Sequence, residues 1–176
     1  MGTSKKTTII MEQENFREVV FQYQSNITNE EVNEVLWAEV INAEDNVFML
    51  YSIPLHGFMI APGDIFVAVE EEIEGETMFV FDHVSNYSGN SVLQIIIPEE
   101  QNTPEVEQKL NTLTEQNCHI EKINENIILM AVPFEVDYQE VKSLIEILAV
   151  AELIDYAEPI ISDKHQEDIE EAQLNN

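Results

Sequence analysis

Basic residues are the scarcest charged side chains in this sequence of 176 residues. Seven Lys and Arg stand against 35 Asp and Glu, a formal net charge of −28, and no Lys or Arg occurs from Glu18 to Gln108. Nucleic-acid binding through phosphates needs positive charge, and an anionic membrane surface would repel this chain. The sequence therefore argues against both partners and predicts attraction to a basic protein. Acidity that only maintains solubility, or that reflects adaptation to salt, remains the alternative.

Cysteine, glycine and long apolar runs are also rare. Cys118 is the single cysteine, so no internal disulfide can form, which fits a cytoplasmic protein. No apolar run approaches the roughly 20 residues of a membrane helix, and no signal-peptide core follows Lys5 and Lys6. With five glycines and no P-loop, GxGxxG or GxSxG motif, neither a phosphate-cradling loop nor a nucleophile elbow is expected.

Metal-binding and catalytic patterns are missing as well. The four histidines have no HxH or HxxxH spacing: His56, His83, His119 and His165. Cys118 is interpreted as a small buried hydrophobe, because acidic surroundings disfavour a thiolate. No metal, cofactor or catalytic residue is predicted, and the protein is not expected to be an enzyme.

The first half of the chain predicts a β-rich subdomain at residues 16–89, after a flexible arm at residues 1–15. Five short apolar-rich segments are separated by turn signals every 8–12 residues or so, which is typical of a small antiparallel barrel. The expected strands are 16–24, 32–41, 47–53, 65–71 and 77–84. Pro54, Gly57 and Pro62 argue against a regular strand between the third and fourth. Trp37, the only tryptophan, lies in an apolar strand and is expected in the core.

The second half predicts a ferredoxin-like βαββαβ subdomain at residues 90–162, so the fold class is α+β. The segments 92–97 and 127–132 are almost uniformly apolar, as expected of central strands, whereas Pro159 confines the last strand to an edge. Two helices, near 104–117 and 138–150, begin after the capping residues Thr103 and Asp137. They cover one face of the sheet, so the N-terminal subdomain or a second copy of the chain must cover the other. Residues 163–176 are expected to form a frayed acidic tail.

Two acidic clusters are candidate partner-binding sites. The first is the tip of the hairpin between the fourth and fifth strands: Glu70, Glu71, Glu72, Glu74 and Glu76. The second is Glu30, Glu31 and Glu34. Either cluster offers a contact surface to a Lys- and Arg-rich partner, and the plainer interpretation of each is a solvated surface.

Several short motifs resemble a bacterial family of uncharacterised domains, the domain of unknown function 4265 family. They are Leu36-Trp37-Ala38-Glu39, Ser52-Ile53-Pro54, Gly63-Asp64-Ile65-Phe66, Ser88 to Val92, Tyr138, and Tyr156-Ala157-Glu158. The resemblance extends over about 16–162 and implies no activity, because the matched residues are those expected to determine a fold. By analogy with small acidic families encoded beside toxins, it favours an immunity-type function.

Together these patterns predict a non-enzymatic acidic binding protein. Its most concrete form is a cytoplasmic immunity or antitoxin protein that occludes the active site of a basic toxin, such as a nuclease. The alternative is a regulatory or sensor domain that binds a small molecule between the subdomains or at a dimer interface.

Overall fold

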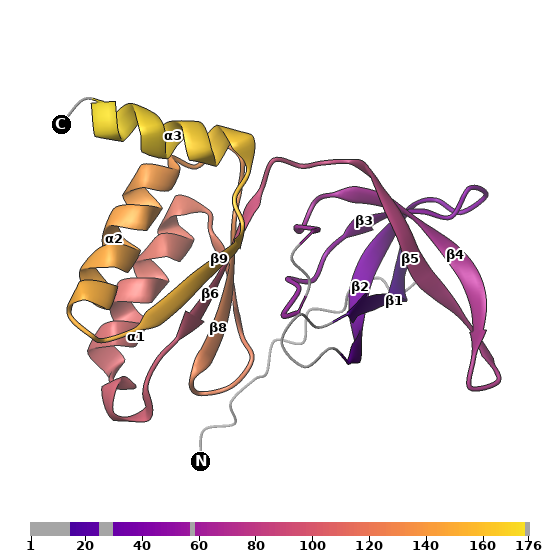
Figure 1. Cartoon of the computed structure of the whole chain (residues 1–176), viewed down its shortest axis with the longest axis horizontal. Coiled ribbons are helices and arrows are strands. Elements are labelled where there is room, and N and C mark those ends of the chain that lie inside the picture. Colours follow the sequence, from indigo (N-terminus) through magenta and orange to yellow (C-terminus); the bar gives the residue numbers. More distant parts are fainter. Residues whose placement is uncertain (1–14, 25–29, 57–58, 175–176) are drawn as a thin grey trace, which may run out of the picture.

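The chain folds into two β-containing subdomains joined by a short linker (Figure 1). The structure is a computed structural model that describes residues 15–24, 30–56 and 59–174. The barrel lies on one side of the molecule, and the second sheet with its three helices lies on the other. The predicted α+β class, with a β-rich unit followed by a ferredoxin-like unit, is confirmed.

The N-terminal subdomain is a closed five-stranded barrel. Its strands are β1 (Phe16–Gln24), β2 (Glu31–Asn42), β3 (Val47–Leu50), β4 (Ile65–Ile73) and β5 (Glu76–Asn86). Neighbouring strands are antiparallel, except that β1 and β5 pair in parallel to close the barrel. Alternate residues point inward and form a core rich in phenylalanine, including Phe21, Phe48 and Phe66. The segment expected to form the third strand, 47–53, pairs only as far as Leu50.

The C-terminal subdomain has the strand order of a ferredoxin-like sheet. It consists of β6 (Ser91–Ile96), β7 (His119–Lys122), β8 (Ile127–Val132) and β9 (Asp155–Ile160), arranged as β7-β8-β6-β9 with every pair antiparallel. The apolar strands β6 and β8 are central, and β9, which contains Pro159, is an edge strand. The expected order is therefore confirmed, because strands buried on both faces need apolar residues at every position.

Helices cover one face of this sheet. The expected helix 104–117 divides into α1 (Pro104–Asn111) and the 3-10 turn η3 (Thr112–Gln116), and α2 spans Tyr138–Val150. A shorter 3-10 turn, η2 (Glu99–Gln101), precedes α1. Both predicted caps form, since Thr103 Oγ1 accepts from Val106 N and an Asp137 carboxylate oxygen accepts from Gln139 N.

The prediction of a frayed tail at residues 163–176 is wrong. Residues Asp163–Leu174 form a third helix, α3, that packs against α2. Its anchor is His165, which is fully buried and stacks on Tyr138 with ring centroids 5.0 Å apart. His165 Nδ1 lies 2.6 Å from Ser91 Oγ, and Nε2 lies 3.2 Å from the Pro133 carbonyl oxygen. A single buried ring in an otherwise polar segment leaves no clear apolar periodicity, so the sequence pattern did not reveal this helix.

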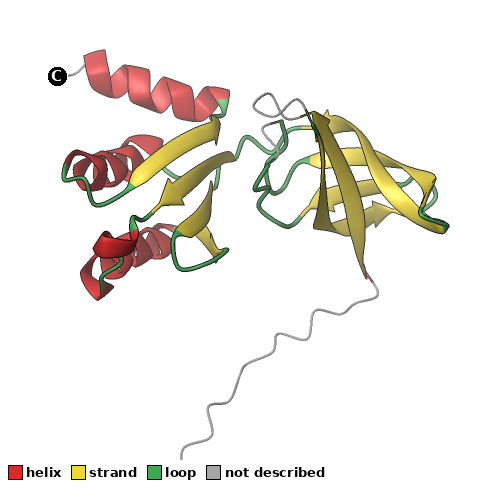
Figure 2. Ribbon diagram, turned by 60° about the horizontal axis from the view of Figure 1, so that its bottom comes forward, coloured by secondary structure: helices red, strands yellow, loops and turns green. Residues whose placement is uncertain are grey.

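The barrel subdomain covers the opposite face of the sheet (Figure 2). Ile53 and Ala61, from the irregular segment between β3 and β4, pack against Val92 and Leu129 of the central strands. Gln94 Nε2 also donates to the Leu55 carbonyl oxygen at 2.6 Å. The sequence predicted that either the N-terminal subdomain or a second copy of the chain covers this face. In the structure the N-terminal subdomain covers it.

Candidate functional site

The acidic hairpin forms as expected and extends away from the C-terminal subdomain (Figure 1). Glu74 and Gly75 both have positive φ, 54° and 88°, as a two-residue type I′ hairpin turn requires. The five glutamates of the acidic hairpin, Glu70, Glu71, Glu72, Glu74 and Glu76, are all exposed. Among the residues that the structure describes, none of the five takes part in an ion pair, so their charge faces solvent.

An apolar row crosses the outer surface of the barrel beside this hairpin. Strand register places Val35 of β2 opposite Val20 of β1, Val20 beside Val80 of β5, and Val80 opposite Val69 of β4. Paired residues project from the same face, so the four valines form one row. Its two middle members, Val20 and Val80, are each only 4% exposed. Val35 and Val69, at its ends, are 49% and 40% exposed.

Trp37 lies on the same outer face and corrects the expectation of a core tryptophan. It is 44% exposed and sits two residues along β2 from Val35, opposite Glu18 of β1. At the other end of the row, and on the same side of it as Glu18, Glu71 lies two residues along β4 from Val69. We call Trp37, the four valines, Glu18 and Glu71 the outer barrel face. Its apolar members were not predicted as a site, although residues 35–38 are all apolar, which indicated that the outward side of β2 is not polar.

The second acidic cluster does not form one surface. Glu34 serves the fold instead: its carboxylate accepts from Leu55 N at 2.7 Å, His56 N at 3.1 Å and Tyr23 Oη at 3.1 Å. Burial, the nearby Glu34 charge and this hydrogen bond together raise the pKa of Tyr23. Glu30 and Glu31 are exposed, whereas Glu34 binds the backbone of the segment between β3 and β4 and fixes that segment against β2.

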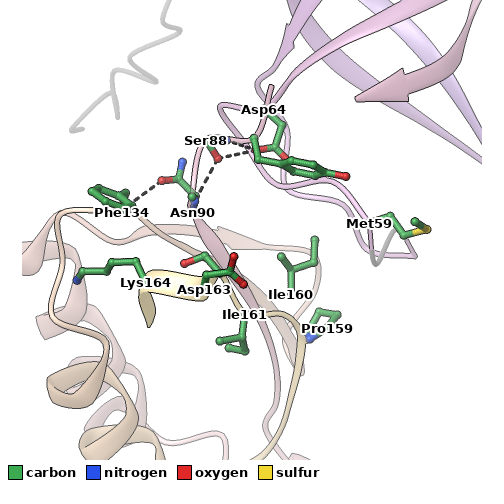
Figure 3. Close-up of a pocket in the computed structure, with 13 residues that line it drawn as sticks. Met59, Asp64, Ser88, Asn90, Phe134, Pro159, Ile160, Ile161, Asp163 and Lys164 are labelled. Atoms are coloured by element: carbon green, nitrogen blue, oxygen red, sulfur yellow. Dashed lines mark hydrogen bonds between the residues drawn. The ribbon is translucent and has the colours of Figure 1, made fainter. Parts of the chain in front are cut away.

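A hydrogen-bonded network built on Asp64 holds the junction of the subdomains (Figure 3). Asp64 is 2% exposed and accepts from Ala61 N, Ser88 N and Ser88 Oγ at 2.9, 2.6 and 2.6 Å. Asn90 continues the network, because its side chain donates to the Pro62 carbonyl oxygen and accepts from Phe134 N. The network ties the linker between β5 and β6 to both subdomains and borders a cleft of about 620 Å³.

The buried reactive groups have structural roles. Burial raises the pKa of Cys118 to about 11, so its thiol is neutral and a poor nucleophile at neutral pH. The Ser91–His165 pair is fully buried, and Ser91 Oγ also accepts from Ser162 N, so the pair fastens α3 to the sheet. Within residues 15–24, 30–56 and 59–174, no group of three or more His, Cys, Asp or Glu side chains has the geometry to hold a metal ion.

One partly buried polar cluster links α2 to β9. Lys142 Nζ donates to Glu158 at 2.6 Å and to Tyr156 Oη at 3.0 Å, and Tyr138 Oη donates to Glu158 at 2.7 Å. Desolvation opposes the charge of Lys142, but its hydrogen bonds to Glu158 and Tyr156 outweigh that effect and raise its pKa. Burial and the bond to Glu158 raise the pKa of Tyr138. Lys142 and Glu158 therefore form an ion pair whose hydrogen-bonding groups are engaged by each other and by the two tyrosines, which indicates a structural role.

Comparison with known proteins identifies the family. The family described as "Domain of unknown function (DUF4265)" matches residues 34–156. The chain belongs to the DUF4265 family. A solved structure described as "Novel crystal structure of a hypothetical protein from Neisseria gonorrhoeae" has the same fold, with a TM-score of 0.68 and 22% sequence identity over 82% of this chain and 94% of that chain. No curated protein gives a significant match.

The motifs that resemble the DUF4265 family contact one another in the structure. Trp37 N donates to Ser52 Oγ at 3.1 Å, and Tyr138 Oη donates to Glu158. Asp64 and Ser88 form the centre of the junction network. These residues hold the DUF4265 fold together across distant segments, which agrees with their interpretation as fold determinants. None of the helices that the structure describes is long and apolar enough to cross a membrane.

Proposed function

We propose that this DUF4265 protein is a non-enzymatic binding protein that captures a basic protein partner on its outer barrel face. The observation that carries the proposal is the juxtaposition of exposed apolar residues with carboxylates on one surface. Trp37, Val35 and Val69 offer apolar contact area, and Glu18 and Glu71 lie beside them. Protein interfaces commonly combine such an apolar centre with a charged rim.

The two parts of this surface have different tasks. The net charge of −28 and the acidic hairpin would accelerate encounter with a basic partner, since long-range attraction acts mainly on the association rate. Trp37 and the exposed valines would lengthen the lifetime of the complex, because buried anchors act mainly on the dissociation rate.

The finer proposal is that the partner is a toxin with a basic active-site surface, such as a nuclease, and that this protein is its cytoplasmic immunity protein. An acidic protein can mimic the charge of the nucleic acid substrate and occlude the site without any chemistry of its own. Cys118, Ser91 and His165 have structural roles, and no metal-binding group occurs among the described residues. The outer barrel face is therefore a stronger candidate for the functional site than these buried groups.

The test compares two variants with the same change in net charge. The hairpin variant replaces Glu70, Glu71, Glu72, Glu74 and Glu76 by Gln. The control variant replaces five exposed glutamates of the C-terminal subdomain by Gln: Glu99, Glu100, Glu115, Glu125 and Glu135. Both reduce the net charge from −28 to −23 by five neutralisations. The partner is first captured from a lysate of the native host with immobilised wild-type protein, and association is then measured by stopped flow.

We expect the hairpin variant to associate about ten-fold more slowly than wild type at low salt, with little change in dissociation rate. The association rate of the control variant should fall much less, and the difference in association rate between the two variants should shrink at high salt. Trp37→Ala should instead accelerate dissociation. Equal association rates for the hairpin and control variants would exclude the hairpin from the interface, and an unchanged dissociation rate for Trp37→Ala would exclude the outer barrel face.

A further inference from the structure

The cleft between the subdomains has the size and position of a ligand site. Its volume of about 620 Å³ falls within the range of 300–1,000 Å³ or so that small-molecule sites occupy. Its walls come from the linker at residues 87–90, from Met59 of the barrel subdomain, from Phe134 after β8, and from the end of β9 continuing into α3. Clefts between two subdomains are a common position for such sites.

Exposed aromatic and aliphatic side chains line this cleft. Tyr87 is 68% exposed, Met59 is 73% exposed and Phe134 is 46% exposed, and Ile160 and Ile161 add aliphatic surface. Gly89 has a φ of 80°, and a Cβ there would come within 2.6 Å of Phe134 Cδ2, so only glycine lets the ring lie this close to the linker. The backbone therefore holds one aromatic wall in place.

Most of the polar side chains at the cleft already have partners. Asp64, Ser88 and Asn90 satisfy one another and nearby backbone groups. Lys164 Nζ donates to Asp168 at 2.7 Å and to the Val136 carbonyl oxygen at 2.6 Å, so its charge is paired and two of its three N–H donors are occupied. It also lies 6.0 Å from the centroid of the Phe134 ring. An anionic ligand would consequently find no available cation on these walls.

Asp163 is the exception and sets the charge preference of the cleft. It is exposed, and no hydrogen bond or ion pair involves its side chain within the part of the chain that the structure describes. Figure 3 shows its carboxylate turned toward the open centre of the cleft, whereas the Lys164 ammonium points away. An acid in the first turn of a helix is common by itself, so only the combination of Asp163 with the aromatic walls of the cleft points to a ligand.

We propose that this cleft binds a small organic cation with an aromatic or aliphatic body, such as an arylalkylammonium. The exposed Tyr87 ring would attract the cation through its π face, Asp163 would pair with it, and Phe134 and the aliphatic residues would bury its body. This site lies on the junction and not on the outer barrel face, so it is independent of the proposed capture of a basic protein.

The test uses the full chain, labelled with ¹⁵N and titrated with benzyltrimethylammonium, benzyl alcohol or phenylacetate in separate NMR experiments at physiological salt. A fragment of this size should bind with a Kd on the order of 1 mM. We expect saturable shifts at the cleft residues with benzyltrimethylammonium, weaker shifts with benzyl alcohol, and none with phenylacetate. Asp163→Asn should weaken binding about five-fold, and Tyr87→Leu, which keeps apolar bulk but removes the ring, about three-fold.

Asp155→Asn is the matched control, since Asp155 is an exposed acid of β9 that does not line the cleft, and its removal changes the net charge by the same amount. Its Kd should equal that of wild type, as should the Kd of the five-glutamine hairpin variant. Unsaturated shifts spread over the acidic surface would mean counterion accumulation only and would overturn the proposal. Equal weakening by Asp163→Asn and Asp155→Asn, or binding of phenylacetate at the cleft, would also overturn it.

Discussion

Replacing Asp64 by Asn tests whether the junction network holds the two subdomains together. The carboxylate accepts three short hydrogen bonds, from Ala61 N and from both the N–H and the hydroxyl of Ser88, at a site that is 2% exposed. An amide has nearly the same shape, but its NH₂ group cannot accept. At least one of the three donors must therefore lose its acceptor in a buried position.

The expected loss of stability follows from the number and kind of bonds. A hydrogen bond to a charged group contributes about 1.5–3 kcal/mol, and a buried donor without an acceptor costs about 1–3 kcal/mol. Because these two contributions overlap, we expect the free energy of unfolding to fall by about 3 kcal/mol. With a urea dependence of about 2 kcal/mol per molar, the unfolding midpoint should fall by roughly 1.5 M.

Urea denaturation with two probes measures this effect in each subdomain. Trp37 is the only tryptophan and reports on the barrel. The three α-helices found among the described residues all lie in the C-terminal subdomain and dominate the far-ultraviolet circular dichroism. Both midpoints should fall together in Asp64→Asn, because the network joins the barrel to the sheet. Asp155→Asn, with the same change in net charge, should stay within about 0.3 M of wild type.

Two results would refute this reasoning. If Asp64→Asn has the same midpoints as Asp155→Asn, the junction network does not stabilise the protein. If the Trp37 midpoint falls while the helical midpoint is unchanged, Asp64 stabilises the barrel alone and does not couple the subdomains.

Three further predictions concern stability. Gly89→Ala should destabilise the protein by about 1–2 kcal/mol more than Gly75→Ala in urea unfolding. Both glycines have a positive φ, but only at Gly89 would the added Cβ clash with a ring, that of Phe134. Equal losses would show that the ring moves aside freely. Burial and the nearby Lys164 lower the pKa of His165 in the folded state. The unfolded chain therefore takes up the proton first as the pH falls below about 6.5, so the stability advantage of wild type over His165→Gln should shrink from pH 8 to pH 5, and a constant difference would contradict the lowered pKa. Finally, the melting temperature should rise as salt increases toward 1 M, where the Debye length is about 3 Å and the repulsion implied by a net charge of −28 is screened; a flat profile would exclude net repulsion as a significant effect.

Local patterns account for most of the secondary structure. The caps at Thr103 and Asp137 and the turn of the acidic hairpin at Glu74 and Gly75 each depend on a few neighbouring residues, so the sequence predicts them directly. The strand order of the C-terminal sheet could also be predicted, because burial on both faces leaves a continuous apolar run in β6 and β8.

The candidate sites depended on contacts that no local pattern contains. Glu34 looked like part of an acidic surface, but its carboxylate meets the backbone of Leu55 and His56, 21 and 22 residues away. The outer barrel face exists only because β1 closes the barrel against β5 and brings Val20 beside Val80. A pairing between strands that are distant in sequence leaves no periodicity within either strand.

The sequence alone determined the acidic charge, the α+β class, the order of strands in the second sheet and the exposed hairpin, because composition and short-range periodicity carry that information. Only the tertiary structure decided that α3 is a helix rather than a tail, that Trp37 faces outward, and that the barrel covers the second face of the sheet. Each of these outcomes depends on one or two long-range contacts, such as His165 with Ser91 and Ile53 with the central strands. Those contacts form when distant segments meet, so their energy is a property of the folded chain and not of any segment within it.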